Sequence, residues 1–248
     1  MEGQARKRDK RKGFHMGYPN CGFWSAMRNG LSAPIEGGAA YPLSVVDCGP
    51  LTMPTGKLVA CDPFVFLRKE DMPAVHLDPG TYPVCVTIAD VSDAKDGSHP
   101  REAYATLLLD SAAEEVARRI ITPAGNGTPC PPEAGPDGSY YGFPVDAGTA
   151  CFADHGAVAA LMPEGDWYET LFDNGTNSSW FARMDDPQHI RQGVANIMLP
   201  NARGGENILI FHSGWGDGFY PIIGGYDKHG RLIRVHIDFM VVFDETAL

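Results

Sequence analysis

The sequence lacks the motifs that identify the commonest enzyme and metal sites. It contains no EF-hand loop and no His-Glu-x-x-His pair, so neither a calcium loop nor a zinc protease site is indicated. Ser213 is not part of a hydrolase nucleophile elbow, because Phe211 and Trp215 occupy the two positions that need glycine. The sequence therefore indicates no particular cofactor, and we predict no metal site.

Long apolar runs are also missing. No run approaches the ~20 residues that a membrane-spanning helix needs. Residues 13–20, which follow the basic start of the chain, do not form the apolar core of a signal peptide. The six cysteines include no Cys-x-x-Cys pair. We therefore expect a cytoplasmic protein whose cysteines are reduced and act as small core residues.

Positive charge is scarce outside residues 1–16. The chain has a net charge of −11, but six of its 20 basic residues lie in residues 1–16, which leaves 14 basic and 29 acidic residues and a net charge of −15 beyond them. So acidic a body repels phosphate backbones, and we expect it to bind no nucleic acid. Residues 1–16 are expected to form a disordered basic tail.

Glycine and proline are abundant. The 29 glycines and 20 prolines make up about a fifth of the chain, which favours turns over long helices. We expect the α+β class: one β-dominated domain over residues 17–248, with a C-terminal antiparallel meander and a few short helices. Residues 122–139 are expected to form a flexible loop rich in proline and glycine, which is a candidate lid.

The middle of the chain predicts several elements. Residues 57–67 read as a strand bent at Pro63, and the turn at residues 78–80 leads into a strand that runs to Ile88. Residues 101–121 are ambiguous: either a strand over residues 104–109 precedes a helix over 112–121, or one long helix covers the whole segment. Two short helices are expected over residues 157–162 and 167–172.

The C-terminal third gives the clearest pattern. We expect strands over residues 207–213, 219–226 and 231–243, joined by turns at residues 214–218 and 227–230. In the third strand apolar residues recur at every second position, which places them on one face. These residues are Ile233, Val235, Ile237, Phe239, Val241 and Phe243.

Polar residues at the ends of the expected strands are the candidates for a site, because functional side chains commonly occupy loops held by a sheet. The candidate catalytic residues are Asp62, Asp146, His212, Ser213 and Asp217, and the candidate ligand-binding residues are Trp215, Tyr220, Arg234, His236 and Asp238. Structural roles compete with this interpretation. Asp217 could have the purely structural role of capping a turn, and Asp154 is expected to cap a helix. The stripe of Arg234, His236 and Asp238 could be a solvated sheet face or the floor of a polar pocket.

Several stretches together resemble a bacterial family known as domain of unknown function 4241. They are Cys61-Asp-Pro-Phe64, Pro79-Gly-Thr-Tyr-Pro83, Gly142-Phe-Pro-Val-Asp-Ala-Gly-Thr149 with Cys151-Phe152 and Asp154, Ser213-Gly-Trp-Gly-Asp-Gly-Phe-Tyr-Pro221 and Asp238-Phe239. They occur in the order in which the family has them. The basic tail, residues 122–139 and residues 112–116 depart from the family pattern. The resemblance implies one β-dominated domain and no established reaction.

Two functions fit these observations. The first is an enzyme, hydrolase- or lyase-like, that acts on a small polar metabolite with a carboxylate or histidine as general base. In it, Ser213 and backbone N–H groups of the glycine-rich turn would hold an oxyanion or phosphate. The alternative is a binding or immunity-type protein whose acidic surface masks a basic protein partner.

Overall fold

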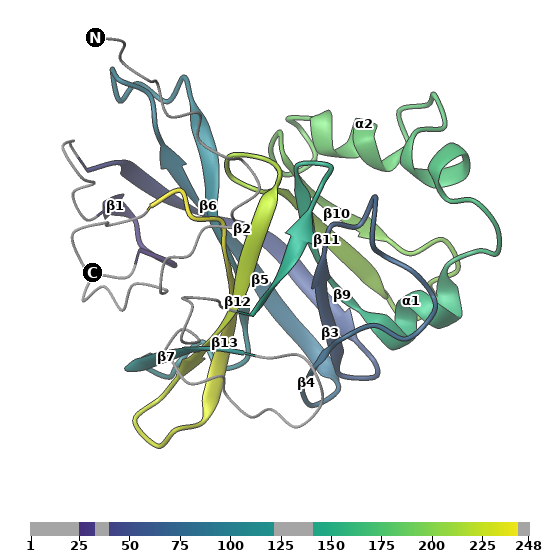
Figure 1. Ribbon diagram of the computed structural model, residues 1–248, viewed down its shortest axis with the longest axis horizontal. Coiled ribbons are helices and arrows are strands. Elements are labelled where there is room, and N and C mark those ends of the chain that lie inside the picture. The colour runs from purple at the N-terminus through teal and green to yellow at the C-terminus, as the bar shows by residue number, and fades with distance from the viewer. Residues whose placement is uncertain (1–24, 33–39, 122–140, 243–248) are drawn as a thin grey trace, which may run out of the picture.

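A computed structural model describes residues 25–32, 40–121 and 141–242 of the chain. It consists of two antiparallel sheets with short helices on one side (Figure 1). This confirms the expected α+β, β-dominated fold class. Residues 1–24 and 122–140, which include the predicted tail and the predicted loop, lie outside the described residues, as do residues 33–39 and 243–248.

The larger sheet, sheet A, has the strand order β1-β2-β5-β6-β13-β12-β7, and β8 pairs with the first half of β12. Its strands are β1 (Gly30–Leu31), β2 (Pro42–Met53), β5 (Gly80–Asp90), β6 (Pro100–Leu108), β7 (Ala117–Ile120), β8 (Gly142–Val145), β12 (Gly218–Tyr226) and β13 (Leu232–Asp238). The smaller sheet, sheet B, has the order β10-β11-β9-β3-β4. Its strands are β3 (Lys57–Cys61), β4 (Val75–His76), β9 (Thr149–Asp154), β10 (Val194–Met198) and β11 (Asn207–His212).

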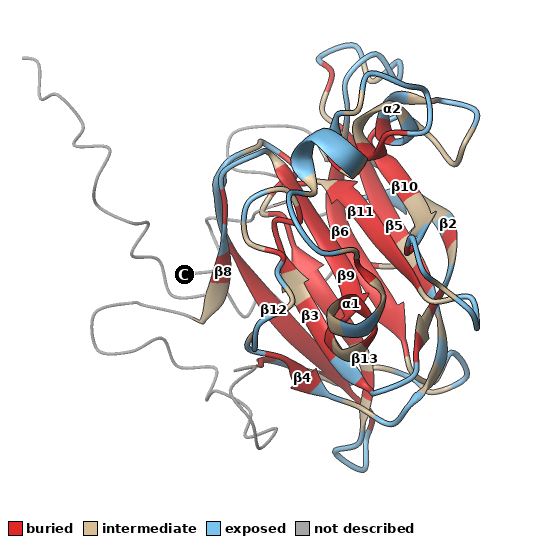
Figure 2. Cartoon of the chain, turned by 90° about the vertical axis from the view of Figure 1, so that its right-hand side faces the viewer, coloured by how far each residue is buried: buried red, intermediate tan, exposed pale blue. Residues whose placement is uncertain are grey.

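The core lies between the two sheets. Val86 of β5 and Val235 of β13 belong to the same buried cluster as Phe152 of β9 and Phe211 of β11. The other face of sheet B packs against α1 (His155–Leu161), the π-helix η1 (Tyr168–Phe172) and α2 (Trp180–Asp185), which form a second apolar cluster. Figure 2 shows α1 in front of the buried strands of sheet B. Because β9 is covered on both faces, all six of its residues are buried.

The predicted meander is only half correct. β12 and β13 form the expected hairpin, but β11 pairs with β9 and β10 in sheet B, and within the described ranges it forms no ladder with β12. Residues 213–217 are therefore a crossover from one sheet to the other. An Asp-Gly pair between two strand-like runs indicates a turn, and it does not reveal that the strands belong to different sheets.

Strand β13 is shorter than predicted. It ends at Asp238, two residues before Met240, whose φ of 54° takes the chain out of the extended conformation. The N–H of Phe239 still donates to the carbonyl of Ala103 in β6. The alternation is confirmed from Ile233 to Ile237, and Phe243 lies outside the described residues. The expected strand over residues 57–67 also ends early, at Cys61, where a turn closes between Asp62 and Phe66.

The helix predicted in residues 112–121 is wrong in both of its versions. The strand β6 is present, but residues 117–120 form β7, which pairs with β12. Residues 117–120 have a helix-forming composition, but the edge of β12 offers hydrogen-bond partners to their backbone. This tertiary pairing outweighs the local helix propensity. The helices expected near residues 157–162 and 167–172 are confirmed as α1 and η1, whereas α2 was not predicted.

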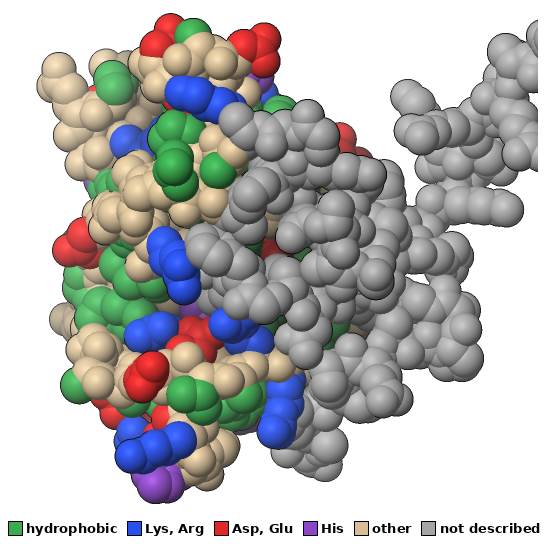
Figure 3. Space-filling model, turned by 90° about the vertical axis from the view of Figure 1, so that its left-hand side faces the viewer, with side chains coloured by type: hydrophobic (Ala, Val, Ile, Leu, Met, Phe, Trp, Pro, Cys, Tyr) green, Lys and Arg blue, Asp and Glu red, His purple; other side chains and the backbone are tan. Residues whose placement is uncertain are grey.

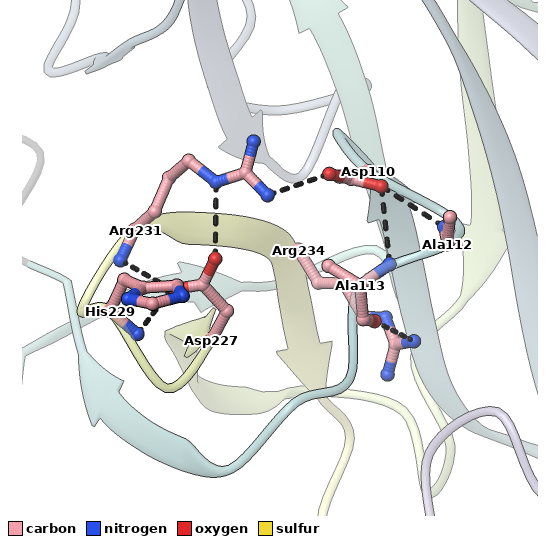
Figure 4. A network of polar contacts seen from close by, with 7 residues as sticks. All are labelled: Asp110, Ala112, Ala113, Asp227, His229, Arg231 and Arg234. Atoms are coloured by element: carbon pink, nitrogen blue, oxygen red, sulfur yellow. Dashed lines mark hydrogen bonds and ion pairs between the residues drawn. The ribbon is translucent and has the colours of Figure 1, made fainter.

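The turn between β12 and β13 is held by charged side chains (Figure 4). Asp227 accepts hydrogen bonds from the backbone N–H groups of His229 and Arg231. The Arg231 guanidinium in turn donates to Asp227 at 3.2 Å and to Asp110 at 2.7 Å. These contacts fix the predicted four-residue turn and tie it to the end of β6.

Among the described residues, no helix is long and apolar enough to cross a membrane.

Candidate functional site

The crossover between the sheets is fastened to the loop that precedes β9. The backbone N–H of Gly148 donates to the Asp217 carboxylate at 3.0 Å, and the Gly148 carbonyl accepts from the N–H of Ser213. The Ser213 hydroxyl donates to the carbonyl of Gly216, so its proton is used within the crossover. The Tyr220 hydroxyl lies within 2.8 Å of the Ser213 and Gly216 carbonyls. Ser213, Asp217 and Tyr220 thus shape the crossover.

Asp62 anchors the same loop, residues 146–149, through hydrogen bonds. Its fully buried carboxylate accepts hydrogen bonds from the backbone N–H groups of Asp146 and Ala147, from the Thr149 hydroxyl, and from the N–H of Phe64. Asp146 itself is exposed and contributes only its backbone to this arrangement. The structure therefore brings Asp62, Asp146 and Asp217 to one loop, residues 146–149, where two of the carboxylates serve as backbone acceptors.

Asp154 has the capping role that was expected of it. The buried carboxylate accepts from the N–H of Ala157 in the first turn of α1, and also from the backbone and hydroxyl of Thr55. The sequence Asp-x-x before an apolar helix is a typical N-terminal signal. Its lone pairs are engaged with backbone and hydroxyl donors, so this carboxylate is structural.

The loop and the crossover border a cavity of about 340 Å³, which is within the size range of small-molecule sites. Its walls are residues 147–149, residues 214–216 and one side of α2. Three ionisable side chains line it: Arg101 from the start of β6, Asp185 from the end of α2, and His212 from the end of β11. The Trp215 ring lines it from the crossover. Of the predicted site residues, His212 and Trp215 line this cavity. They share it with Arg101 and Asp185, which the sequence did not single out.

Behind His212 lies a buried carboxyl group that the sequence did not single out. Gly193 separates them: a β-carbon on this glycine would lie 2.7 Å from Nδ1 of His212 and 3.0 Å from Oε1 of Glu102. Both groups therefore face one point beside Gly193. The Glu102 side chain is only 4% exposed, and its charge partner is Arg191, whose Nη2 lies 3.8 Å from Oε1. Glu102 is thus a buried neighbour of the cavity-lining His212.

The surroundings shift both groups toward neutrality. Burial raises the pKa of Glu102 to about 7, although the nearby Arg191 and Arg101 oppose this shift. Burial also lowers the pKa of His212 below its usual value of 6.5; the Asp185 carboxylate opposes the shift, and Arg101 and Arg191 add to it. A carboxyl group with a raised pKa thus lies beside a histidine with a lowered pKa, and groups with shifted pKa values are common in acid–base centres.

Arg101 is held in place by aromatic contacts. Its guanidinium lies 5.3 Å from the centre of the exposed Trp215 ring, and its Nη2 is 2.8 Å from Nε2 of His99. Its Nε is buried and has no hydrogen-bond partner within the described part of the chain. A guanidinium held in one orientation by stacking is suited to a carboxylate or phosphate.

A β-bulge in β6 explains why Glu102 points toward sheet B. Tyr104 pairs with Thr87 but Glu102 pairs with Ile88, so Ala103 is an extra residue in the strand. Without it, Glu102 would share a face with Thr106, whose hydroxyl contacts His236 on the opposite side of sheet A. Bulges often redirect a side chain beside an active site. No alternation pattern in the sequence reveals such an extra residue.

Arg234 and His236 lie outside the cavity, in a buried network on the face of sheet A that points away from sheet B. His236 contacts the Thr106 hydroxyl through Nδ1 at 2.8 Å and Glu115 through Nε2 at 3.2 Å. Arg234 and Arg118 also bond to Glu115. His236 is fully buried, so the interpretation of this stripe as a solvated face is wrong. On this side of the molecule, basic side chains surround acidic ones (Figure 3).

Asp238 closes the end of β13. Its carboxylate accepts from the backbone N–H of Met240 at 2.7 Å and is 5% exposed. Burial raises the pKa of Tyr220 to about 12, and the charges of Asp217 and Asp238 add to this shift. Asp238 and Tyr220 thus have structural roles near the crossover.

In the described ranges, no three His, Cys, Asp or Glu side chains are arranged to hold a metal ion.

These features define a β-rich protein with a polar cavity where the chain crosses between two packed sheets. The chain belongs to the family described as protein of unknown function (DUF4241), whose model matches residues 51–237. That range includes Asp62, Glu102, Gly193 and His212. No curated protein and no solved structure matches the chain.

Proposed function

We propose that the protein is a hydrolase- or lyase-like enzyme that acts on a small polar metabolite bound in the cavity beside His212. The observation that carries this proposal is the position of His212, which lines the cavity with Arg101 and has the Glu102 carboxyl behind it. A base, an anion-binding cation and a group that positions the base are the parts that general acid–base catalysis needs.

His212 is the general base in this proposal. Because the pKa of His212 lies below 6.5, its imidazole is mostly neutral at pH 7 and can accept a proton from the substrate or from a water molecule. Arg101 then stabilises the negative charge that develops on the substrate. We assign this role to Arg101 rather than to Ser213, since the Ser213 hydroxyl already donates to Gly216.

Glu102 acts as a positioning residue. It does not line the cavity, but its carboxyl lies beside the Nδ1 edge of His212. A carboxyl group behind an imidazole fixes the orientation of the ring and stabilises the cation that forms when the ring takes a proton. With a pKa of about 7, Glu102 is partly ionised at pH 7, and its anionic form can supply this stabilisation.

A cytoplasmic location is part of the proposal. Cys48, Cys61, Cys85 and Cys151 are free thiols, and the Sγ atoms of Cys61 and Cys151 lie 3.7 Å apart without a disulfide. Free, mostly buried cysteines are usual in proteins of a reducing compartment.

The test is a turnover screen with pools of small polar metabolites, followed by mass spectrometry, on the wild type, His212→Gln and the matched control His229→Gln. His229 is exposed on the β12–β13 turn. We expect the wild type and His229→Gln to consume the same compound, and His212→Gln to be slower by about 10²–10⁴-fold. Equal rates for all three proteins would contradict the proposal. Salt-sensitive binding of a basic protein, unchanged in His212→Gln, would favour the alternative of a binding or immunity-type protein.

A further inference from the structure

The cavity carries two opposite charges on separate walls. Arg101 lines it from β6, and Asp185 lines it from the last residue of α2. Both charges act on His212, which lines the same cavity: the Asp185 charge raises its pKa and the Arg101 charge lowers it. The lining is therefore dipolar.

Neither charge is neutralised by a direct partner. In the described part of the chain, no hydrogen bond or ion pair reaches the Asp185 carboxylate, and Asp185 is exposed at the cavity rim. Among the same described residues, no ion pair reaches the Arg101 guanidinium, which is stacked on Trp215. By contrast, Glu115 elsewhere in the molecule is bonded by Arg118, Arg234 and His236. The cavity is therefore a place where two complementary charges remain available to a ligand.

The remaining walls are apolar. Phe181 and Met184 of α2 line the cavity together with the Trp215 ring. A ligand that satisfies all of these groups needs an anionic end, a cationic end and an apolar part. With about 340 Å³ of space, the cavity limits such a ligand to a small molecule.

We propose that the cavity binds a small zwitterion of the amino-acid type, with its carboxylate on Arg101, its ammonium group on Asp185 and an apolar side chain against Phe181, Met184 and Trp215. This inference rests on the proposed function, because it concerns the same cavity and specifies its substrate class. The opposite charges also give selectivity, since a ligand that lacks either charge leaves one of the two residues unpaired.

The test is calorimetry with three ligands of one shape: racemic leucine, leucinamide, which lacks the carboxylate, and 4-methylpentanoate, which lacks the ammonium group. We expect the wild type to bind leucine at least tenfold more tightly than either analogue. Arg101→Gln is expected to lose the preference for leucine over leucinamide. Asp185→Asn is expected to lose the preference for leucine over 4-methylpentanoate. Arg183→Gln, an exposed change on the same helix, serves as the control and should bind leucine as the wild type does.

Equal affinity of the wild type for the three ligands, or no binding of leucine, would overturn the inference. So would a loss of affinity in Arg183→Gln as large as that in Arg101→Gln. The two proposals fail separately. Turnover of a compound without an ammonium group that still depends on His212, with no leucine binding, would overturn the zwitterion site alone. Selective leucine binding with no effect of His212→Gln on turnover would overturn the proposed catalytic role of His212 alone.

Discussion

Glu102 and His212 face the same point beside Gly193, although one belongs to sheet A and the other to sheet B. The pairing joins a buried carboxyl whose pKa is about 7 to an imidazole whose pKa is below 6.5. Each sheet alone would leave its residue without this neighbour. The packing of the two sheets therefore brings the two groups together.

The Glu102→Gln variant is expected to be more stable than the wild type at neutral and basic pH. The folded pKa of Glu102 is about 7 and the unfolded value is 4.5. Below pH 4.5 the carboxyl is neutral in both states. Between pH 4.5 and 7 the unfolded chain loses a proton that the folded chain keeps, so the stability of the wild type falls as pH rises. Above pH 7 the difference should reach about 3 kcal/mol in favour of the variant.

Urea denaturation between pH 4 and pH 8 measures this effect. Glu169→Gln is the control, because Glu169 is exposed on η1. The free energy of unfolding of the control should follow the wild type at every pH. A pH-independent difference between Glu102→Gln and the wild type would show that the carboxyl is not held neutral by burial.

Gly193→Ala tests the close approach of the two groups. The new β-carbon would overlap Nδ1 of His212 and Oε1 of Glu102, and the φ of Gly193 is +88°. Gly165→Ala has the same backbone strain, with a φ of +93°, but nothing within 4 Å of its β-carbon. We expect Gly193→Ala to cost about 1–3 kcal/mol more than Gly165→Ala in thermal or chemical denaturation. Equal losses would mean that Gly193 is needed only for its backbone conformation.

Asp62→Asn tests the anchor of the cavity loop. The buried carboxylate accepts four hydrogen bonds, and an amide group would turn a donor toward some of these N–H groups. We expect a loss of about 2–4 kcal/mol in the free energy of unfolding. Asp146→Asn, at an exposed side chain in the same loop, should change it by less than about 0.5 kcal/mol. A similar small effect at both positions would contradict the anchoring role.

Glu115 is expected to make the network around His236 sensitive to acid. Burial raises the pKa of Glu115, but the hydrogen bond and charge of His236 and the nearby Arg118 and Arg234 outweigh it, and the pKa falls to about 2. Its contribution to stability is therefore present above pH 4.5 and is lost as pH falls toward 2. At pH 7, Glu115→Gln should destabilise the protein by about 1–3 kcal/mol, because it leaves the partly buried Arg118 and Arg234 without their anionic partner.

The control for this network is Glu114→Gln, which changes an exposed neighbour. Denaturation at pH 7 should not distinguish it from the wild type. The difference between Glu115→Gln and the wild type should shrink as pH falls below 4.5. A difference that stays constant down to pH 2 would contradict the low pKa.

Local patterns in the sequence predicted the parts of the fold that depend on neighbouring residues. The alternation from Ile233 to Ile237, the Asp227 turn and the Asp154 cap are examples, and each follows from chemistry within a few positions. Residues 112–121 show where such reasoning fails. There a segment rich in helix formers became β7, because a distant strand edge satisfies its backbone.

The site was predicted in part for the same reason. His212 and Trp215 stand in a glycine-rich segment that already indicated a site, and both line the cavity. Glu102 was missed, because its position depends on the extra residue at Ala103 and on the packing of a second sheet. Its one local signal is a carboxylate directly before the mostly apolar residues 103–108 of β6, where a charge is unusual unless it is paired or functional.

The most direct test of the central claim is chemical rescue of His212. In the His212→Ala variant, turnover of the compound found in the metabolite screen should fall by about 10²–10⁴-fold. Added imidazole should restore part of the rate, and the restored rate should rise with pH as free imidazole loses its proton. A variant that folds as the wild type does but turns over the compound at the wild-type rate, or that imidazole fails to rescue, would contradict the role of His212 as general base.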